Sequence, residues 1–177
     1  MLAILIWLAI GLPVVGGLVV AFVGDSREKL QHVVAVGFSA AAAVAALAIL
    51  PQAGADAAVS VSFGPMFGDL TFVPDGLGAF LAAVATVVGC LAVVFSVDYM
   101  AGEAELGRYY SLVLYFIGAM AALALTSNLF FLFLFWEITA LCSYALISFY
   151  NDDPKAVAGG IKALIITQFG GIGLLAL

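Results

Sequence analysis

Long apolar runs, each about 18–23 residues, are the feature that most restricts how this chain can fold. A helix of that length crosses a hydrocarbon core of about 30 Å. The backbone finds no hydrogen-bond partners in lipid, so each run must cross as a helix. We predict an all-α fold, a polytopic bundle in one transmembrane domain (residues 1–177) with about six spans, at 2–23, 32–50, 76–97, 108–125, 128–150 and 157–177.

Composition limits the function classes that remain open. Hydrophobic residues make up 66% of the chain and charged residues 9%, whereas soluble domains average about 45–50% and about 25%. The net charge of −6 comes mostly from loops, and acidic loops repel polyanions, so we expect no nucleic-acid partner. Cys90 and Cys142 fall inside apolar runs and predict packing residues. We find no phosphate-binding glycine loop, metal spacing or nucleophile constellation, and expect no cofactor, metal or catalytic site in this chain.

One loop, residues 51–75, is long enough to hold structure of its own. Residues 59–63 (VSVSF) alternate apolar side chains with serines, and 70–73 (LTFV) follow a Gly/Pro-containing turn. Alternation at period two around such a turn predicts a short β-hairpin, with an irregular loop as the alternative. Asp75 precedes the third run and is a predicted N-cap.

Basic residues predict the orientation of the chain in the membrane. The loops that alternate crossings place on one side are 24–31, 98–108 and 150–156, which hold Arg27, Lys29, Arg108 and Lys155. The opposite loops, 51–75 and 126–127, hold no Lys or Arg. We therefore expect the three basic loops to be cytoplasmic, with the N-terminus and the hairpin on the outer face of a plasma membrane.

Glu137 is the residue whose position packing alone explains least. It is the tenth residue of the predicted span 128–150, and a lone charged carboxylate at that depth costs several kcal/mol. Desolvation favours the neutral form of such a group and a nearby cation favours the charged form, so a group balanced between them can exchange a proton. This pattern indicates a proton or ion pathway. A permanently protonated Glu that joins two helices is the alternative.

Four further residues could share in such a pathway. Lys162 lies roughly 8 Å from the cytoplasmic end of its span and Glu137 roughly 19 Å from that of its own, a gap of about 10 Å. A water-linked relay fits that gap better than a direct ion pair, although Lys162 could instead snorkel to the interface. Tyr144 shares the helix face of Glu137, and Thr139 and Ser143 lie on other faces. These three either line a water path or make ordinary interhelical hydrogen bonds.

Small residues are frequent in the last run. Small-xxx-small spacing at Ala156/Gly160 and Gly159/Ala163 predicts close approach to another helix. The pair at 170–171 (GG) indicates either plain packing or a local break in the helix.

Residues 127–171, SNLFFLFLFWEITALCSYALISFYNDDPKAVAGGIKALIITQFGG, resemble a known family. They are similar to the antiporter-like membrane subunits shared by respiratory complex I and Mrp-type cation/proton antiporters. The residues that carry the resemblance are the FWE motif ending at Glu137, the turn that follows it, and a Lys-Ala pair opening the last run with Lys162 downstream. Residues 74–78 (PDGLG) and 108–110 (RYY) also fit.

The resemblance implies proton translocation through water-filled half-channels. It places Glu137 and Lys162 at the positions of the family's fifth-helix Glu and sixth-helix Lys. The family pairs that Glu with a Lys on a seventh helix, and its members have many more spans. The resemblance therefore implies that the chain is the N-terminal portion of a longer subunit, with the close cation outside it.

Within the family, residues 167–171 (TQFGG) are more similar to the A-type polypeptide of Mrp antiporters than to the L-type polypeptide of complex I (NADH dehydrogenase subunit 5). The latter has a charged Arg and Asp where this chain has Gln168 and Gly171. We expect a proton-translocating part of a multisubunit Na⁺/H⁺ antiporter, with other membrane subunits, lipid, protons and Na⁺ as partners. The alternatives are a proton-pumping subunit of NADH:quinone oxidoreductase and a structural membrane subunit without its own ion path.

Overall fold

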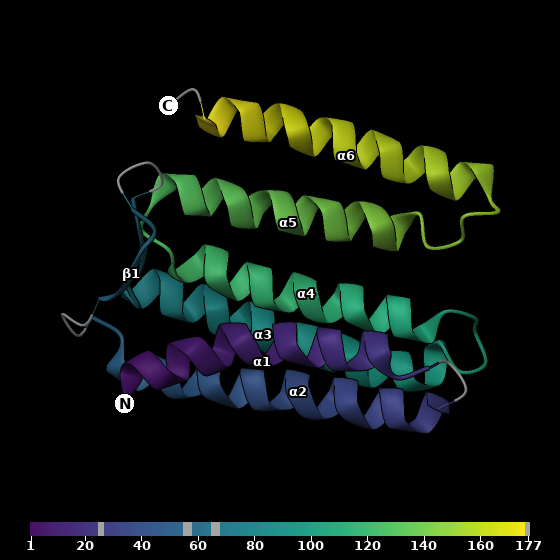
Figure 1. The fold of residues 1–177 in the computed structure, drawn as a ribbon, viewed down its shortest axis with the longest axis horizontal. Coiled ribbons are helices and arrows are strands. Elements are labelled where there is room, and N and C mark those ends of the chain that lie inside the picture. The colour runs from purple at the N-terminus through teal and green to yellow at the C-terminus, as the bar shows by residue number, and fades with distance from the viewer. Residues whose placement is uncertain (25–26, 55–57, 65–67, 176–177) are drawn as a thin grey trace.

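The computed structural model describes residues 1–24, 27–54, 58–64 and 68–175. Its helices, drawn in Figure 1, are α1 (Leu2–Phe22), α2 (Glu28–Ile49), the short 3₁₀ turn η2 (Leu50–Gln52), α3 (Gly76–Tyr99), α4 (Leu106–Leu125), α5 (Leu129–Ile147) and α6 (Pro154–Leu175). Within the described ranges, six helices are long and apolar enough to cross a membrane. The predicted fold class and the six predicted spans are confirmed.

Side-chain caps begin two of these helices. Asp75 caps α3, as predicted, because its Oδ1 accepts a hydrogen bond from the backbone N–H of Gly78 at 2.7 Å. Asn128 caps α5, where its Oδ1 accepts from the N–H groups of Phe130 and Phe131 at 2.9 and 3.4 Å. Each cap satisfies N–H groups that a helix leaves without an internal partner.

Three helix ends differ by three or four residues from the predicted limits of the apolar runs. α2 begins at Glu28 and α6 at Pro154, earlier than the predicted 32 and 157. An acidic residue and a proline both suit the first turn of a helix, so these helices extend beyond their apolar parts. α5 ends at Ile147, three residues before the predicted limit at 150.

The predicted hairpin is present. Strands β1 (Val59–Ser62) and β2 (Asp69–Phe72) pair antiparallel, and residues 65–67 of the turn lie outside the described residues. The hairpin is fastened to the turn between α4 and α5: Ser127 N–H donates to Thr71 O at 2.9 Å, and Asn128 Nδ2 donates to Asp69 O at 3.0 Å. The first residues of α1 and the last of α6 lie at this hairpin end of the molecule (Figure 1).

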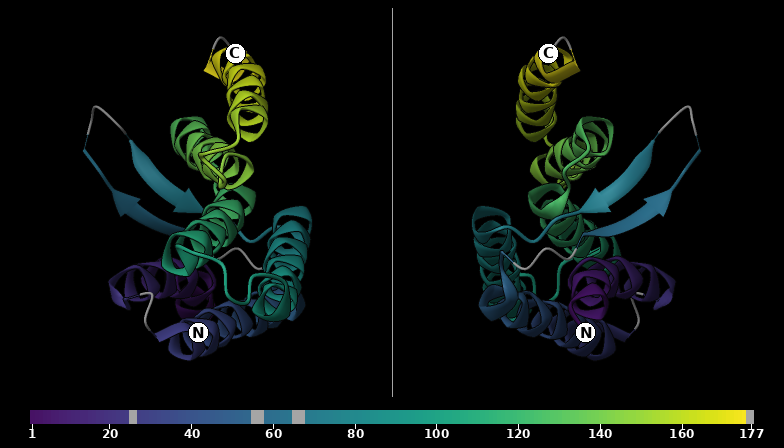
Figure 2. Two further views of the ribbon diagram at one scale, coloured as in Figure 1. Left: turned by 90° about the vertical axis from the view of Figure 1, so that its right-hand side faces the viewer. Right: turned by 90° about the vertical axis from the view of Figure 1, so that its left-hand side faces the viewer.

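Helices α1–α4 form one compact group, and α5 and α6 extend from it (Figure 2). α1 and α3 each pack against both α2 and α4, while α5 packs on α4 and α6 on α5. Small side chains let the four helices of the group approach closely. The buried alanines of the core cluster nearest the hairpin are Ala9, Ala45, Ala46, Ala79, Ala82, Ala83, Ala121 and Ala122.

A glycine marks one of the closest approaches in this group. A Cβ added to Gly78 of α3 would lie 2.5 Å from the backbone oxygen of Ala124 in α4 and 2.6 Å from Asp75 Oδ1. Backbone atoms cannot rotate away as a side chain can, so α3 and α4 meet here only because residue 78 has no side chain.

Candidate functional site at the α5–α6 seam

Glu137 faces α6 and takes a hydrogen bond from it. The side-chain amide of Gln168 in α6 donates through Nε2 to Oε2 of Glu137. The Glu137 side chain is half-buried. Its second oxygen, Oε1, is buried and has no hydrogen-bond partner among the described residues. The two carboxyl oxygens therefore have different surroundings.

Gly171 lies next to the unpartnered oxygen. A Cβ built on Gly171 would stand 2.7 Å from Glu137 Oε1 and 3.4 Å from Cε2 of Phe133. Its neighbour Gly170 is exposed, and the closest atom to a Cβ there is Cζ2 of Trp136 at 3.9 Å, an ordinary contact. α6 is continuous through both glycines, so they serve close packing and do not break the helix.

Farther from the hairpin, α5 and α6 come into close contact at Gly160. A Cβ on Gly160 would overlap Ser148 Oγ and would lie 3.1 Å from the backbone oxygen of Tyr144. The close approach predicted from the small-residue spacing is confirmed at this glycine. Tyr144 is half-buried, and the helix face that it is predicted to share with Glu137 stays a prediction.

The structure does not bring Lys162 to Glu137. Lys162 is exposed, as are Ile161 and Ile165 beside it. It precedes Gln168 by six residues, which is about 9 Å along the axis of α6. That separation agrees with the depth difference predicted from sequence. Among the described residues, no salt bridge to Glu137 is formed.

The two hydroxyl residues predicted as possible water-path lining differ in their surroundings. Thr139 is buried, and its Oγ1 donates to the backbone oxygen of Trp136 at 2.7 Å. This hydroxyl is satisfied by its own helix and leaves no donor for a water at Glu137. Ser143 is half-buried. Of the two cysteines, Cys142 is buried and Cys90 half-buried, and both are free.

Gln168 is the site residue that our sequence reasoning missed, since we used it to compare families and assigned it no contact. The positions of Gln168 and Glu137 along their predicted spans could have indicated this contact. Gln168 stands eleven residues after the predicted start of its span at 157, and Glu137 thirteen before the end of its own at 150. In antiparallel neighbours those counts give nearly the same level in the membrane.

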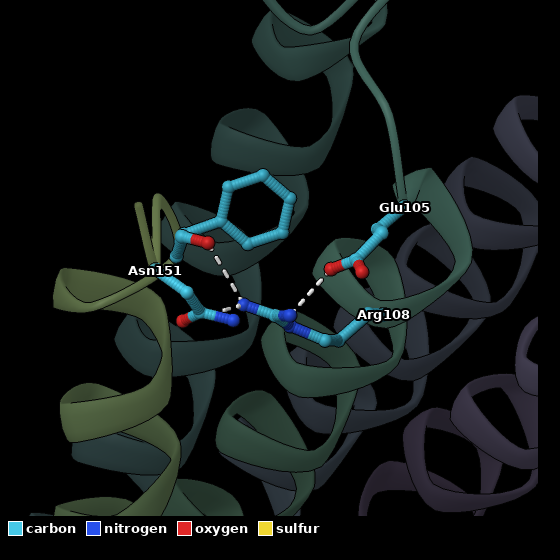
Figure 3. Close-up of polar contacts among 4 residues, drawn as sticks. Glu105, Arg108 and Asn151 are labelled. Atoms are coloured by element: carbon cyan, nitrogen blue, oxygen red, sulfur yellow. Dashed lines mark hydrogen bonds and ion pairs between the residues drawn. The ribbon is translucent and has the colours of Figure 1, made fainter. Parts of the chain in front are cut away.

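Arg108, the third residue of α4, holds the loop that joins α5 to α6 (Figure 3). Its Nη2 donates to the backbone oxygen of Phe149 at 2.8 Å and lies 3.4 Å from Asn151 Oδ1. The guanidinium carbon is 4.9 Å from the Phe149 ring centroid, and Nη1 pairs with Glu105. The arginine therefore fixes where the chain leaves α5 and enters α6, which helps to set the height of Gln168 opposite Glu137.

No group of three or more His, Cys, Asp or Glu side chains within the described ranges could hold a metal ion. The polar side chains where α5 packs against α6 are a carboxyl, an amide and nearby hydroxyls. These groups can hold or pass a proton.

Two family models match the chain. One, described as NADH:quinone oxidoreductase/Mrp antiporter, TM, matches residues 126–176, which include the whole α5–α6 seam. The other, described as NADH-Ubiquinone oxidoreductase (complex I), chain 5 N-terminus, matches residues 61–110. The chain belongs to the NADH:quinone oxidoreductase/Mrp antiporter family. The resemblance noted in the sequence is therefore confirmed.

Curated relatives point to the Mrp branch of this family. The chain is 39% identical over 112 residues to the A1 polypeptide of the Na(+)/H(+) antiporter of Staphylococcus saprophyticus, covering 63% of this chain and 14% of the relative. It is 38% identical over 117 residues to the corresponding A1 polypeptide of Staphylococcus aureus, covering 66% of this chain and 15% of the relative. The chain thus spans about one seventh of the length of these relatives.

A solved structure, that of the Mrp complex from Dietzia sp. DQ12-45-1b, shares the fold. The superposition has a TM-score of 0.81 at 25% sequence identity and covers 99% of this chain and 18% of the other. The arrangement of six helices and a hairpin is therefore an arrangement found in an Mrp assembly.

Proposed function

We propose that this chain is a proton-translocating part of a multisubunit cation/proton antiporter, and that Glu137 is the group that takes up and releases the proton. The observation that supports this most is the hydrogen bond from the neutral Gln168 amide to a carboxyl in the middle of a membrane-spanning helix. An amide N–H can donate to an ionised carboxylate and equally to the carbonyl oxygen of a carboxylic acid. The same neighbour therefore serves both protonation states.

Lys162 would bias this equilibrium without fixing it. At an effective dielectric constant of 20, the attraction between unit charges falls from about 4 kcal/mol at 4 Å to about 2 kcal/mol at 9 Å. Lys162 is exposed, lies about 9 Å along the helix axis from the level of Gln168, and forms no ion pair with Glu137 among the described residues, so its pull is weaker than that of a direct ion pair. In our proposal Lys162 tunes the path on its side of Glu137, with Tyr144, Thr139 and Ser143 as secondary lining residues.

The relatives suggest the setting in which this site works. Those named above are parts of Na(+)/H(+) antiporters, and the structural neighbour is an Mrp complex. We propose that the six helices form one transmembrane domain in a cell membrane, assembled with other membrane subunits and exchanging protons for Na⁺. The basic loops at 24–31, 98–108 and 150–156 would face the cytoplasm, with the hairpin end outside.

A second candidate is a proton-pumping subunit of an NADH:quinone oxidoreductase. The observation that favours it is the match of residues 61–110 to the complex I chain 5 model. In that enzyme the same carboxyl would respond to NADH oxidation in place of a Na⁺ gradient.

Replacing Glu137 with Gln in the assembled complex tests the proposal. Gln keeps the size of the side chain and can still bond to Gln168, so we expect the complex to assemble while Na⁺-dependent pH change in everted vesicles is abolished. Glu103→Gln, which removes an exposed carboxylate from the loop before α4, is the matched control and should keep exchange. Unchanged exchange in Glu137→Gln with normal assembly would contradict the proposal. Loss of NADH-driven acidification in that variant, with no Na⁺ dependence in the wild type, would favour the second candidate.

A further inference from the structure

The two oxygens of Glu137 are not equivalent, and the difference indicates which of them exchanges the proton. Oε2 is held by the Gln168 amide, while Oε1 is buried with no partner among the described residues. Oε1 faces α6 at Gly171, where the bare backbone leaves the space that a Cβ would otherwise take.

We propose that Gln168 is a positioning residue that holds Oε2 of Glu137, so that the proton binds and leaves at Oε1, which the missing side chain of Gly171 allows to lie against α6. This rests on the proposed function of Glu137. On uptake, an O–H bond forms between the proton and Oε1 and the carboxylate becomes neutral. On release, that bond breaks and the negative charge returns to the carboxylate.

The hydrogen-bond chemistry selects Oε1. The amide N–H of Gln168 already points at Oε2, and a proton placed on that oxygen in the direction of the amide would face another hydrogen. An amide that donates to one carboxyl oxygen thus leaves the other as the oxygen to protonate.

The space beside Oε1 depends on one position of α6. A methyl group on residue 171 would approach Oε1 to 2.7 Å, closer than a carbon and an oxygen normally come without bonding. Either the carboxyl turns away from Gln168, or Oε1 is displaced from its place against α6. A methyl group on residue 170 meets nothing closer than 3.9 Å.

Gly171→Ala and Gly170→Ala make a matched pair in the complete protein within the assembled antiporter. Both replace a glycine by alanine in the same turn of α6, so they change helix propensity equally. We expect Na⁺-dependent proton exchange to fall about tenfold or more in Gly171→Ala, because small displacements of a reacting group have effects of that order. Gly170→Ala should stay near the wild-type rate. Equal rates in the two variants would overturn the inference.

Gln168→Leu tests the positioning role through the pH dependence of exchange. Without the donor, Oε2 of Glu137 loses the hydrogen bond that holds it. The pH profile of exchange should therefore differ from that of the wild type. Thr167→Val, which removes a hydroxyl bonded to its own helix at Ala163 O and Leu164 O, should leave the profile in place. A lower rate in Gln168→Leu with an unmoved profile would reduce Gln168 to a packing role and overturn the inference.

These outcomes separate the two proposals. If Glu137→Gln abolishes exchange while Gly171→Ala matches Gly170→Ala, Glu137 remains the proton carrier and the assignment of Oε1 fails. If Glu137→Gln keeps exchange, both proposals fail.

Discussion

The four-helix group α1–α4 and the α5–α6 pair each contain a helix of the same mean hydropathy, and these two helices are packed in different ways. α4 and α6 have the same mean hydropathy over their most apolar windows, yet half of that window is buried inside this chain in α4 and 11% in α6. In lipid, an apolar side chain is stable whether or not another helix covers it. Hydropathy therefore predicts that a helix crosses the membrane, and small or polar residues at particular positions decide what it packs against.

The two regions also place their polar groups differently. In the group, buried hydroxyls make hydrogen bonds: Thr86 Oγ1 donates to Ala82 O at 2.9 Å, Ser111 Oγ donates to Gly17 O at 2.9 Å, and Ser96 Oγ bonds to Tyr109 OH at 2.7 Å. The α5–α6 pair instead joins a carboxyl and an amide side chain across the seam, Glu137 and Gln168. In our proposal the thinly packed pair carries the proton and the well-packed group supports it.

Gly160→Leu should give the largest effect and break the pair while sparing the group. A Cβ that overlaps Ser148 Oγ, with the rest of a leucine beyond it, forces α6 away from α5. Over-packing of this kind costs about 3 kcal/mol or more. Hydrogen exchange read by mass spectrometry should show faster exchange in α6 peptides and unchanged exchange in α4 peptides. The control is Gly159→Leu, because a Cβ there meets Ile147 at an ordinary 3.7 Å. Loosening of α4 as well would mean that the two regions form one cooperative unit.

Gly78→Ala should have the next largest effect, and it should destabilise the α1–α4 group while sparing the α5–α6 pair. The added methyl would meet the backbone oxygen of Ala124 at 2.5 Å, and we expect a loss of about 2 kcal/mol in the stability of the group. The melting temperature in detergent should fall, with faster hydrogen exchange in α3 and α4. Gly76→Ala, which has nothing within 4 Å of its Cβ, is the control and should melt like the wild type. A variant as stable as this control would show that α3 and α4 can slide apart without cost.

Arg108→Lys should have the smallest effect, on the connection between the two regions. Lys keeps the charge but lacks the planar fork that bonds Phe149 O and stacks on the Phe149 ring. We expect a loss of about 1 kcal/mol, seen as faster hydrogen exchange in the loop at 148–153 with little change inside α4. The control Arg27→Lys should leave that loop unchanged. Unchanged exchange in Arg108→Lys would mean that the position of α6 does not depend on this anchor.

Most of the fold could be predicted from the sequence because most of its elements are determined by neighbouring residues. The six spans, the hairpin and the Asp75 cap each depend on a short window, and the structure confirms them. The end of α5 was misplaced because aromatic and apolar residues continue to Tyr150 after the helix has stopped at Ile147. Apolar character reports depth in the membrane, not helical hydrogen bonding.

The contact of Gln168 with Glu137 could not be read from any single window. The contact depends on the height of α6 relative to α5, which the loop after α5 sets. Arg108 of a different helix, α4, holds that loop in place. The exposure of Lys162 likewise depends on which face of α6 meets α5, and that face is chosen by Gly160 and Gly171. Counting residues along the span predicted the depth of Lys162 in the membrane, but could not predict which way its side chain points.

Asn128 uses both ends of its amide at once. The oxygen caps α5, and the nitrogen donates to Asp69 in the hairpin. An aspartate could cap the helix but could not donate, and a lysine could donate but not cap. Folding of the hairpin and folding of the first turn of the helix bearing Glu137 are therefore coupled equilibria, and the coupling free energy is the same in both directions.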